Sequence, residues 1–286
     1  MNTQVDPRVT ELFTRAYASP DHDPFTWTHD EPFGSAVLVH GFPGTPADMR
    51  PLATVLHELG WNVHGVLLPG FGKQIASLAS KHTEDWLNAV TDALLAQHLP
   101  GKPRLLVGHS MGGALSLAAT ARVQVDALML LAPFWKINHA LWTMLPVLSR
   151  LVPTVQPFRL AKMDMNDPET QKGLRQFMPE ANLDDPELQT TMRDFSVPTS
   201  MIDQVRRAGQ MGADAARAIN LPTCIIQGSD DMLVPPANTL ALAESMACQP
   251  AVELIRGKHE LNDATLSSWP QVQALATRFI RRLMAS

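Results

Sequence analysis

Residues 104–113 read Arg-Leu-Leu-Val-Gly-His-Ser-Met-Gly-Gly. The apolar run before Gly108 predicts a strand, and the small and apolar residues after Gly113 predict a helix. Between them lies the pattern G-x-S-x-G, with Ser110 at its centre. A sharp strand-to-helix turn of this kind holds a serine hydroxyl clear of the backbone at the N-terminus of a helix, and glycines let the two elements approach closely. Ser110 is therefore our leading candidate for a nucleophile.

Outward from this turn, short apolar runs alternate with helical patterns. Several runs are continuously apolar, which is typical of strands buried on both faces of a parallel sheet. The alternation predicts an α/β fold of the doubly wound kind, with a mostly parallel central sheet flanked by helices. The predicted strands cover residues 36–39, 63–68, 105–107, 127–131, 223–227 and 252–255.

Two predicted helices have clear signals at their ends. The run Thr45-Pro46-Ala47-Asp48 reads as an N-cap, a proline in the first turn and an acid three residues after the cap, and Gly60 ends this helix. The run Thr83-Glu84-Asp85 opens a second helix, which we expect to extend to about His98.

Residues 134–212 break this alternation. They contain no convincing strand, and helix starts are predicted at Asp167, at Asp185 and near Pro198. We therefore expect a helical insertion between two strands of a core that is formed by residues 1–133 and 213–286. Within this core, residues 1–24 are expected to form a short helix and an N-terminal extension.

The composition excludes several classes of function. Hydrophobic residues make up 45% of the 286 and charged residues 18%, as in ordinary globular proteins, and a net charge of −5 does not favour nucleic-acid binding. Cys224 and Cys248 form no disulfide framework and lack metal-ligand spacing. The sequence has no signal-peptide pattern and no apolar stretch of the ~20 residues that span a bilayer. We expect a cytoplasmic enzyme with no metal or organic cofactor.

A serine hydroxyl needs a base within hydrogen-bond reach, and the base needs a carboxylate that orients it. His259 lies in a loop just past a predicted strand, and Asp230 and Asp231 both follow another. Functional residues of open α/β sheets gather at such carboxyl ends of strands. Neighbouring side chains point in different directions, so only one of the two acids is expected to reach His259.

Four motifs are spread over most of the chain. They are His40-Gly41-Phe42-Pro43-Gly44-Thr45, Gly108-His109-Ser110-Met111-Gly112-Gly113, Gly228-Ser229-Asp230-Asp231 with Val234-Pro235, and Lys258-His259-Glu260. With the chain order Ser, Asp, His, they resemble the α/β-hydrolase superfamily, and within it the bacterial carboxylesterases and monoacylglycerol lipases with a small helical cap. The resemblance implies that Asp231 is the acid, from the family pattern G-x-x-D-x-x-V-P, and that the insertion is a cap or lid. Relatives often have histidine where this chain has Phe71, and we assign Phe71 no catalytic role.

An oxyanion hole needs two donors aimed at the oxygen of the tetrahedral intermediate. One is expected to be the backbone N–H of Met111, the residue after the candidate nucleophile. The second is expected from the loop after the strand at 36–39, where Pro43 has no N–H to donate. The resemblance implies that this donor is the N–H of Phe42.

The insertion is dense in apolar side chains, which suit the wall of a pocket for acyl chains. Trp135, Trp142 and Met144 are our candidates for substrate contact, although packing on the core would also explain apolar residues here. We expect a serine hydrolase of small apolar esters, monoacylglycerols or short to medium acyl esters, that forms an acyl-serine intermediate. Transient contact with lipid aggregates is compatible with this expectation.

Two alternatives stay open. A triad of Ser110, Asp231 and His259 would serve an amidase, a C–C hydrolase or an acyltransferase equally well, because a fold and a triad do not determine the substrate. A ligand-binding relative with the same fold would do no chemistry, but it would have no need for an intact Ser-Asp-His set.

Overall fold

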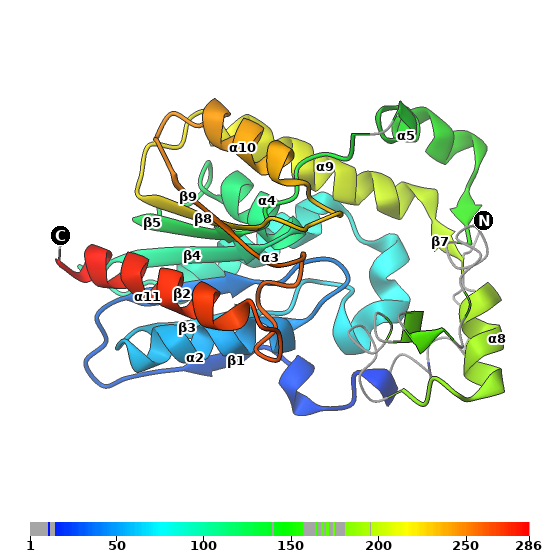
Figure 1. The fold of residues 1–286 in the computed structure, drawn as a ribbon, viewed down its shortest axis with the longest axis horizontal. Coiled ribbons are helices and arrows are strands. Elements are labelled where there is room, and N and C mark those ends of the chain that lie inside the picture. Colours follow the sequence, from blue (N-terminus) through cyan, green and yellow to red (C-terminus); the bar gives the residue numbers. More distant parts are fainter. Residues whose placement is uncertain are drawn as a thin grey trace.

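The computed structural model describes residue 11 and residues 15–138, 140–156, 164, 167–168, 170–171, 174, 181–194 and 196–285. Within this part of the chain, a sheet of seven strands lies between two layers of helices (Figure 1). Its strands are β1 Phe25–Trp27, β2 Ser35–Val39, β3 Asn62–Val66, β4 Arg104–His109, β5 Ala127–Leu131, β8 Thr223–Gly228 and β9 Ala251–Ile255. They lie in the order β1-β3-β2-β4-β5-β8-β9. The α/β fold that the sequence predicts, with a mostly parallel central sheet flanked by helices, is confirmed.

The sheet is parallel except at one edge. Strand β1 pairs antiparallel with β3, and the other neighbouring strands of this sheet pair parallel. The six predicted strands are confirmed, with ends that shift by one or two residues. The edge strand β1 is an addition. It packs where β3 has Gly65, since a Cβ on that glycine would lie 2.2 Å from the ring of Phe25.

The strand order determines where loops meet. After β2 the chain runs outward to β3 and then returns to the other side of β2 for β4, so the order reverses between β2 and β4. Ligands of open α/β sheets bind at the carboxyl ends of strands beside such a reversal. Here a Cβ on Gly41, after β2, would lie 3.1 Å from Cβ of Ser110, after β4.

Helices cover both faces of the sheet (Figure 1). Helices α2 Arg50–Glu58 and α11 Trp269–Ala285 pack on one face, and α3 Thr83–Ala96, α4 Met111–Ala119 and α10 Pro236–Ser245 pack on the other. The predicted helix after Thr45 begins as a short 3₁₀ helix, η2 Pro46–Met49, and continues as α2. Two further 3₁₀ helices lie in the described part of the core, η1 Pro20–His22 and η3 Gly72–Ser80.

The insertion at residues 134–212 is mainly helical where it is described. It holds α5 Ala140–Leu151, α8 Pro186–Asp194, most of α9 Thr199–Ala216, and two short strands, β6 Thr154–Val155 and β7 Val197–Pro198. The helix starts at Asp185 and near Pro198 are confirmed, whereas much of the segment after Asp167 lies outside the described residues. Strands β6 and β7 pair antiparallel, which corrects the expectation that this region has no strand.

Helix α9 joins the insertion to the core. It packs along α4 so closely that a Cβ on Gly212 would lie 2.5 Å from the carbonyl oxygen of Ala114. The predicted boundary between insertion and core, at residue 212, therefore falls inside a continuous helix. Because α4 begins at the G-x-S-x-G turn, this contact anchors the insertion directly behind the candidate nucleophile.

Candidate active site

The turn after β4 holds Ser110 in an unusual backbone conformation. Its φ of 53° and ψ of −118° are strained for a residue with a side chain, and the residue is the N-cap of α4. Glycines make the turn feasible. A Cβ on Gly108 would lie 2.4 Å from the carbonyl oxygen of Gly112, and one on Gly112 would lie 2.2 Å from that of Val39. The predicted strand, turn and helix around Ser110 are confirmed.

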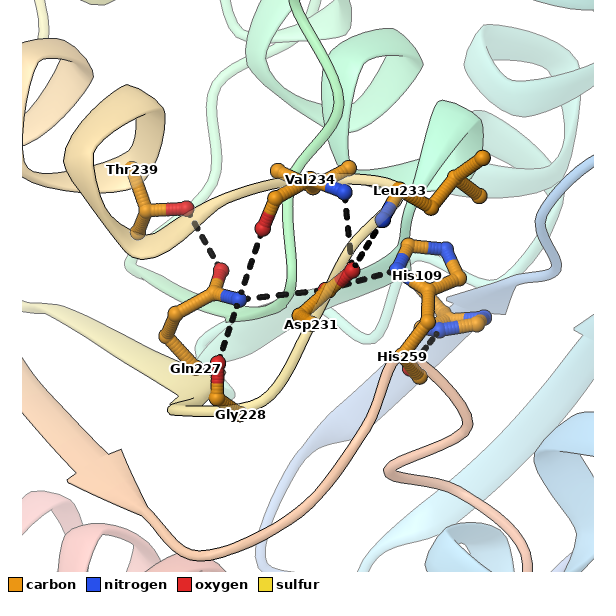
Figure 2. Close-up of polar contacts among 8 residues, drawn as sticks. All are labelled: His109, Gln227, Gly228, Asp231, Leu233, Val234, Thr239 and His259. Carbon is orange, nitrogen blue, oxygen red and sulfur yellow. Dashed lines mark hydrogen bonds and ion pairs between the residues drawn. The ribbon is translucent and has the colours of Figure 1, made fainter.

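The loops after β8 and β9 bring Asp231 and His259 together (Figure 2). Nδ1 of His259 lies 2.8 Å from Oδ2 of Asp231. The side chain of Asp231 is fully buried, and that of His259 is 12% exposed. Asp230 is exposed to solvent, and its N–H donates to the carbonyl of Gly257. Of the two neighbouring acids, Asp231 is the one that contacts the histidine.

Four donors surround the Asp231 carboxylate. Oδ1 accepts the N–H groups of Leu233 at 2.9 Å and Val234 at 2.8 Å, and Oδ2 accepts the amide of Gln227 at 3.1 Å besides His259. Burial by itself raises the pKa of this carboxyl, but the bonds from His259, Val234 and Gln227 outweigh burial and hold the pKa below its usual value. Asp231 is therefore ionised and held in one orientation.

Gln227 also belongs to this site, although it is not among the candidate residues chosen from the sequence. Its Nε2 donates to Asp231 and to the carbonyls of Gly228, at 3.1 Å, and Val234, at 3.0 Å. Its Oε1 accepts the hydroxyl of Thr239 at 2.5 Å. The sequence feature that points to Gln227 is a polar residue at the end of an apolar strand. Such an amide is fully buried here, and a buried amide needs hydrogen-bond partners.

His109, next to Ser110, holds the loop of the candidate base. Its Nε2 lies 3.0 Å from the carbonyl oxygen of His259, and the two rings are 5.0 Å apart. Burial, followed by the nearby His259, lowers the pKa of His109 to about 3, so its ring is neutral at pH 7. Since a carbonyl only accepts, Nε2 carries the proton of this neutral ring. This bond brings the His259 loop against the Ser110 turn.

The loop after β2 forms a tight turn from Gly41 to Gly44. The N–H of Gly44 donates to the carbonyl of Gly41 over 3.0 Å, and within the described part of the chain the N–H of Phe42 donates to no other backbone carbonyl of a turn or loop. His40 fixes the start of the turn: its Nε2 accepts the N–H of Leu68, so Nδ1 carries the proton and donates to the carbonyl of Gly41 at 2.8 Å. Burial lowers the pKa of His40 to about 4, which keeps this ring neutral.

Aromatic packing supports the same turn. Phe71 is fully buried, with ring centroids 5.1 Å from His40 and 5.7 Å from Phe42. The other predicted donor, Met111, is the first residue of α4, where backbone N–H groups have no partner within the helix. The structure thus places the turn of Phe42 and the start of α4 on either side of the reversal between β2 and β4.

The three candidate substrate contacts of the insertion differ in their surroundings. Nε1 of Trp135 donates to the carbonyl of Asn238 over 2.8 Å, which ties this indole to α10. The half-buried ring of Trp142 packs edge-on against Phe134 at 5.6 Å, and the N–H of Phe134 donates to the carbonyl of Ser110. Met144 is 50% exposed. Trp142 therefore has a short route of contacts to the Ser110 turn.

Two features are absent from the described residues. Among them, no group of three or more His, Cys, Asp or Glu side chains could hold a metal ion. In the same part of the chain, every helix is too short or too polar to cross a bilayer.

Known proteins resemble this chain over much of its length. Residues 30–261 match the family described as serine aminopeptidase, S33. A monoacylglycerol lipase of Mycolicibacterium smegmatis is 25% identical over 236 residues, which cover 78% of this chain and 79% of that protein. A carboxylesterase of Bacillus subtilis is 30% identical over 107 residues, which cover 37% of this chain and 43% of that protein.

The fold recurs in solved structures. The crystal structure of the monoacylglycerol lipase from Paleococcus ferrophilus superimposes with a TM-score of 0.65, at 18% identity, over 90% of this chain and 98% of that one. At this identity the likeness concerns the fold. Together with the family match over residues 30–261, it shows that the chain is an α/β-hydrolase and belongs to the serine aminopeptidase S33 family.

Proposed function

We propose that this carboxylic ester hydrolase of the α/β-hydrolase kind cleaves its substrates through an acyl-Ser110 intermediate. The observation that carries the proposal is the buried His259–Asp231 pair, at 2.8 Å, beside the strained Ser110 turn. A serine alcohol needs such a base, and the base needs such an ionised partner. Ser110, His259 and Asp231 are therefore nucleophile, general base and orienting acid.

The reaction has two halves. Asp231 bonds Nδ1 of His259, which leaves Nε2 as the atom that removes the Ser110 proton. Ser110 Oγ then attacks the ester carbonyl carbon, and the N–H groups of Phe42 and Met111 stabilise the oxyanion. Collapse of this intermediate breaks the bond to the alcohol, which leaves with the proton held by His259. A water molecule activated by His259 next hydrolyses the acyl-enzyme and releases the carboxylic acid.

The substrates that we propose are monoacylglycerols or short to medium acyl esters. Relatives named monoacylglycerol lipase and carboxylesterase support this class. The insertion supports it too, because its apolar side chains suit an acyl chain if it acts as a cap over Ser110. The family description also names an aminopeptidase, and that reaction would use the same three residues on an amide.

Covalent labelling and a substrate series test the proposal. We expect a fluorophosphonate to add once, on Ser110, and Ser110→Ala to lower kcat for p-nitrophenyl esters by about 10³-fold or more. Ser116→Ala is the matched control. Ser116 is fully buried on the same helix, and its hydroxyl has no hydrogen-bond partner among the described residues, so its removal is expected to leave kcat intact.

The outcomes separate the candidate functions. Hydrolysis of aminoacyl anilides faster than of any ester would favour the aminopeptidase reaction. An adduct on another residue, or full activity in Ser110→Ala, would contradict the mechanism. A chain that neither reacts with fluorophosphonate nor hydrolyses any of these substrates would be a ligand-binding relative.

A further inference from the structure

Residues 15–23, which we call the strap, lie between the insertion and the turn that carries Phe42. Three strap side chains are buried although the segment precedes the sheet: Ala16 is 1% exposed, Tyr17 3% and His22 7%. We propose that the strap links the insertion to the Gly41–Gly44 turn and so positions the N–H of Phe42. The inference rests on the proposed role of Phe42 as an oxyanion donor.

Several contacts fasten one end of the strap to the core. Nδ1 of His22 lies 2.8 Å from Oγ1 of Thr45, the residue that follows the turn. Nε of Arg50, on α2, donates to the carbonyl of Asp21 over 2.9 Å. Asp23 pairs with Lys73, on η3, at 2.8 Å. Of these contacts, the bond between His22 and Thr45 is the one that bears directly on the loop after β2.

Thr45 connects this bond to the turn itself. Its N–H donates to Oδ2 of Asp48 over 3.0 Å. A Cβ on Gly44 would lie 2.0 Å from the same oxygen, so the carboxylate is in tight contact with the end of the turn. Thr45 is thus held between Asp48 and the strap. A shift of Thr45 must move Gly44, whose N–H closes the turn around Phe42.

The other end of the strap contacts the insertion. Ala16 belongs to an apolar cluster that is separate from the two clusters of the core. The buried partners that the structure describes lie in the insertion, two of them on α8: Leu174, Leu183, Leu188 and Met192. In Figure 1 the strap is the dark blue segment at the lower edge, between the core and the side of the molecule that carries α8.

Through these contacts the strap affects the position of the proposed oxyanion donor, in addition to the stability of the fold. Packed clusters pass displacements on because they have no free volume to absorb them. If a substrate moves α8, the Ala16 contact changes, and His22 passes the change to Thr45. Since the donors of an oxyanion hole act only at the correct distance, a displacement of about 1 Å would lower the rate up to ~100-fold.

A double-mutant cycle tests the link. Ala16→Asp puts an unpaired carboxylate into the apolar cluster at the insertion, and Thr45→Val removes the hydroxyl that bonds His22. We expect each change alone to lower kcat for a short p-nitrophenyl ester about tenfold, with little change in KM. If both act through the strap, the double variant is expected to lose about tenfold as well, instead of the ~100-fold loss of independent sites.

Two control variants accompany the cycle. Ala18→Asp introduces the same charge two residues away, at an exposed position of the strap, and is expected to keep the wild-type kcat. Thr45→Ser restores the hydroxyl and is expected to recover most of the activity that Thr45→Val loses. The rate of fluorophosphonate addition to Ser110 is expected to follow the same pattern, because its phosphoryl oxygen would occupy the oxyanion hole.

Urea unfolding measures the stability of each variant in parallel. kcat is measured under conditions in which each variant is folded, well below its unfolding midpoint. Losses in kcat that multiply in the double variant would overturn the link, as would destabilised variants that keep the wild-type kcat. A wild-type chain with no Ser110-dependent hydrolysis would instead overturn the proposed function, and the catalytic role of the strap with it. Multiplying losses in an active, Ser110-dependent enzyme would overturn the strap alone.

Discussion

His109 and His259 lie side by side, yet their environments prepare them for different tasks. His109 is enclosed, and its pKa of about 3 keeps the ring neutral, so it does not compete with His259 for the negative charge of Asp231. Its Nε2 proton instead anchors the backbone of the His259 loop. Among the described residues, Asp231 is the acid that pairs with His259, and the neutral N–H groups of Gln227, Leu233 and Val234 hold its carboxylate in place.

The two neighbouring acids give the sharpest test at this scale. Asp231→Asn is expected to lower kcat/KM by about 10³-fold, because an amide can favour the wrong tautomer of His259. Asp230→Asn is the matched control, since Asp230 is exposed and bonds Gly257 through its backbone; we expect less than about a twofold change. Steady-state kinetics on one ester check both variants, and equal losses would show that the acid is wrongly assigned.

Gln227 is expected to act through Asp231, as a positioning residue. Gln227→Leu removes one donor from the carboxylate and leaves the carbonyls of Gly228 and Val234 short of a partner, so we expect roughly a tenfold loss of kcat together with lower stability. Gln227→Glu has nearly the same shape but sets a second carboxyl group beside Asp231. Like charges raise the pKa of a carboxyl. The decline of kcat/KM on acidification is therefore expected to begin at higher pH in this variant, and identical pH profiles would rule out a role through Asp231.

At the scale of elements, the sequence predicts most accurately the strands and turns that are determined by a local pattern of residues. The buried strands β2, β4, β5 and β8 are continuous apolar runs, and the turn at Ser110 is marked by glycines that the backbone geometry requires. The edge strand β1 has no such pattern of its own. It depends on Gly65, whose missing side chain makes room for Phe25 from a distant part of the chain.

Only part of the site could be predicted from the sequence, because a local pattern does not determine contacts between distant residues. Ser110, Asp231 and His259 follow strands, and their chemistry limits their tasks. The bond from Thr239 to Gln227 joins a helix to a strand, and that from His109 to His259 joins residues 150 positions apart. No periodicity encodes such pairs. The structure shows that Gln227 and His109 are buried. A buried amide or imidazole needs hydrogen-bond partners, so the need for these bonds follows from the structure.

The insertion offers two tryptophans with different expected effects. Trp135 is bonded to Asn238, and its backbone packs where a Cβ on Gly209 would lie 2.6 Å away, so Trp135→Ala is expected to lower stability without changing relative rates among esters. Trp142 lies against Phe134 near the Ser110 turn. If it contacts the acyl chain, Trp142→Ala shifts the ratio of octanoate to butanoate ester hydrolysis by about fourfold or more, since one buried methylene contributes about 0.8 kcal/mol. Kinetics with both esters check this, and an unchanged ratio in Trp142→Ala would make the insertion a structural cover.

For the molecule as a whole, Asp48 is the point at which distant parts of the chain meet. Its carboxylate holds Thr45 at the end of the Gly41–Gly44 turn, and its carbonyl accepts the amide of Asn262, from the loop after β9, at 2.8 Å. Its charge also contributes, after burial, to raising the pKa of the buried Tyr17 in the strap. An acid in such a place is expected to lower stability at neutral pH, because it is ionised where little water reaches it.

The loss of stability that the ionised Asp48 causes depends on pH. Burial, with a smaller contribution from Asp263, raises the pKa of Asp48 from 3.8 to about 6, against the lowering effect of the Thr45 N–H. Between these two values the folded chain binds a proton that the unfolded chain has lost, so this group favours the folded state at low pH, and the advantage disappears as pH rises to about 6. The difference corresponds to at most about 3 kcal/mol.

Asp48→Asn removes this titration while keeping an oxygen that can accept the Thr45 N–H. Relative to the wild type, the variant is therefore expected to gain stability as pH rises from 4.5 to 7.5, with most of the gain complete by about pH 6. Urea unfolding at several pH values measures the difference, and Asp92→Asn, at an exposed position on α3, is the control that should show no such trend. A difference between Asp48→Asn and wild type that stays constant with pH would mean that Asp48 titrates alike in both states. A gain in stability accompanied by a slower reaction would show instead that the carboxylate is retained because a charged acceptor holds the turn more firmly than an amide does.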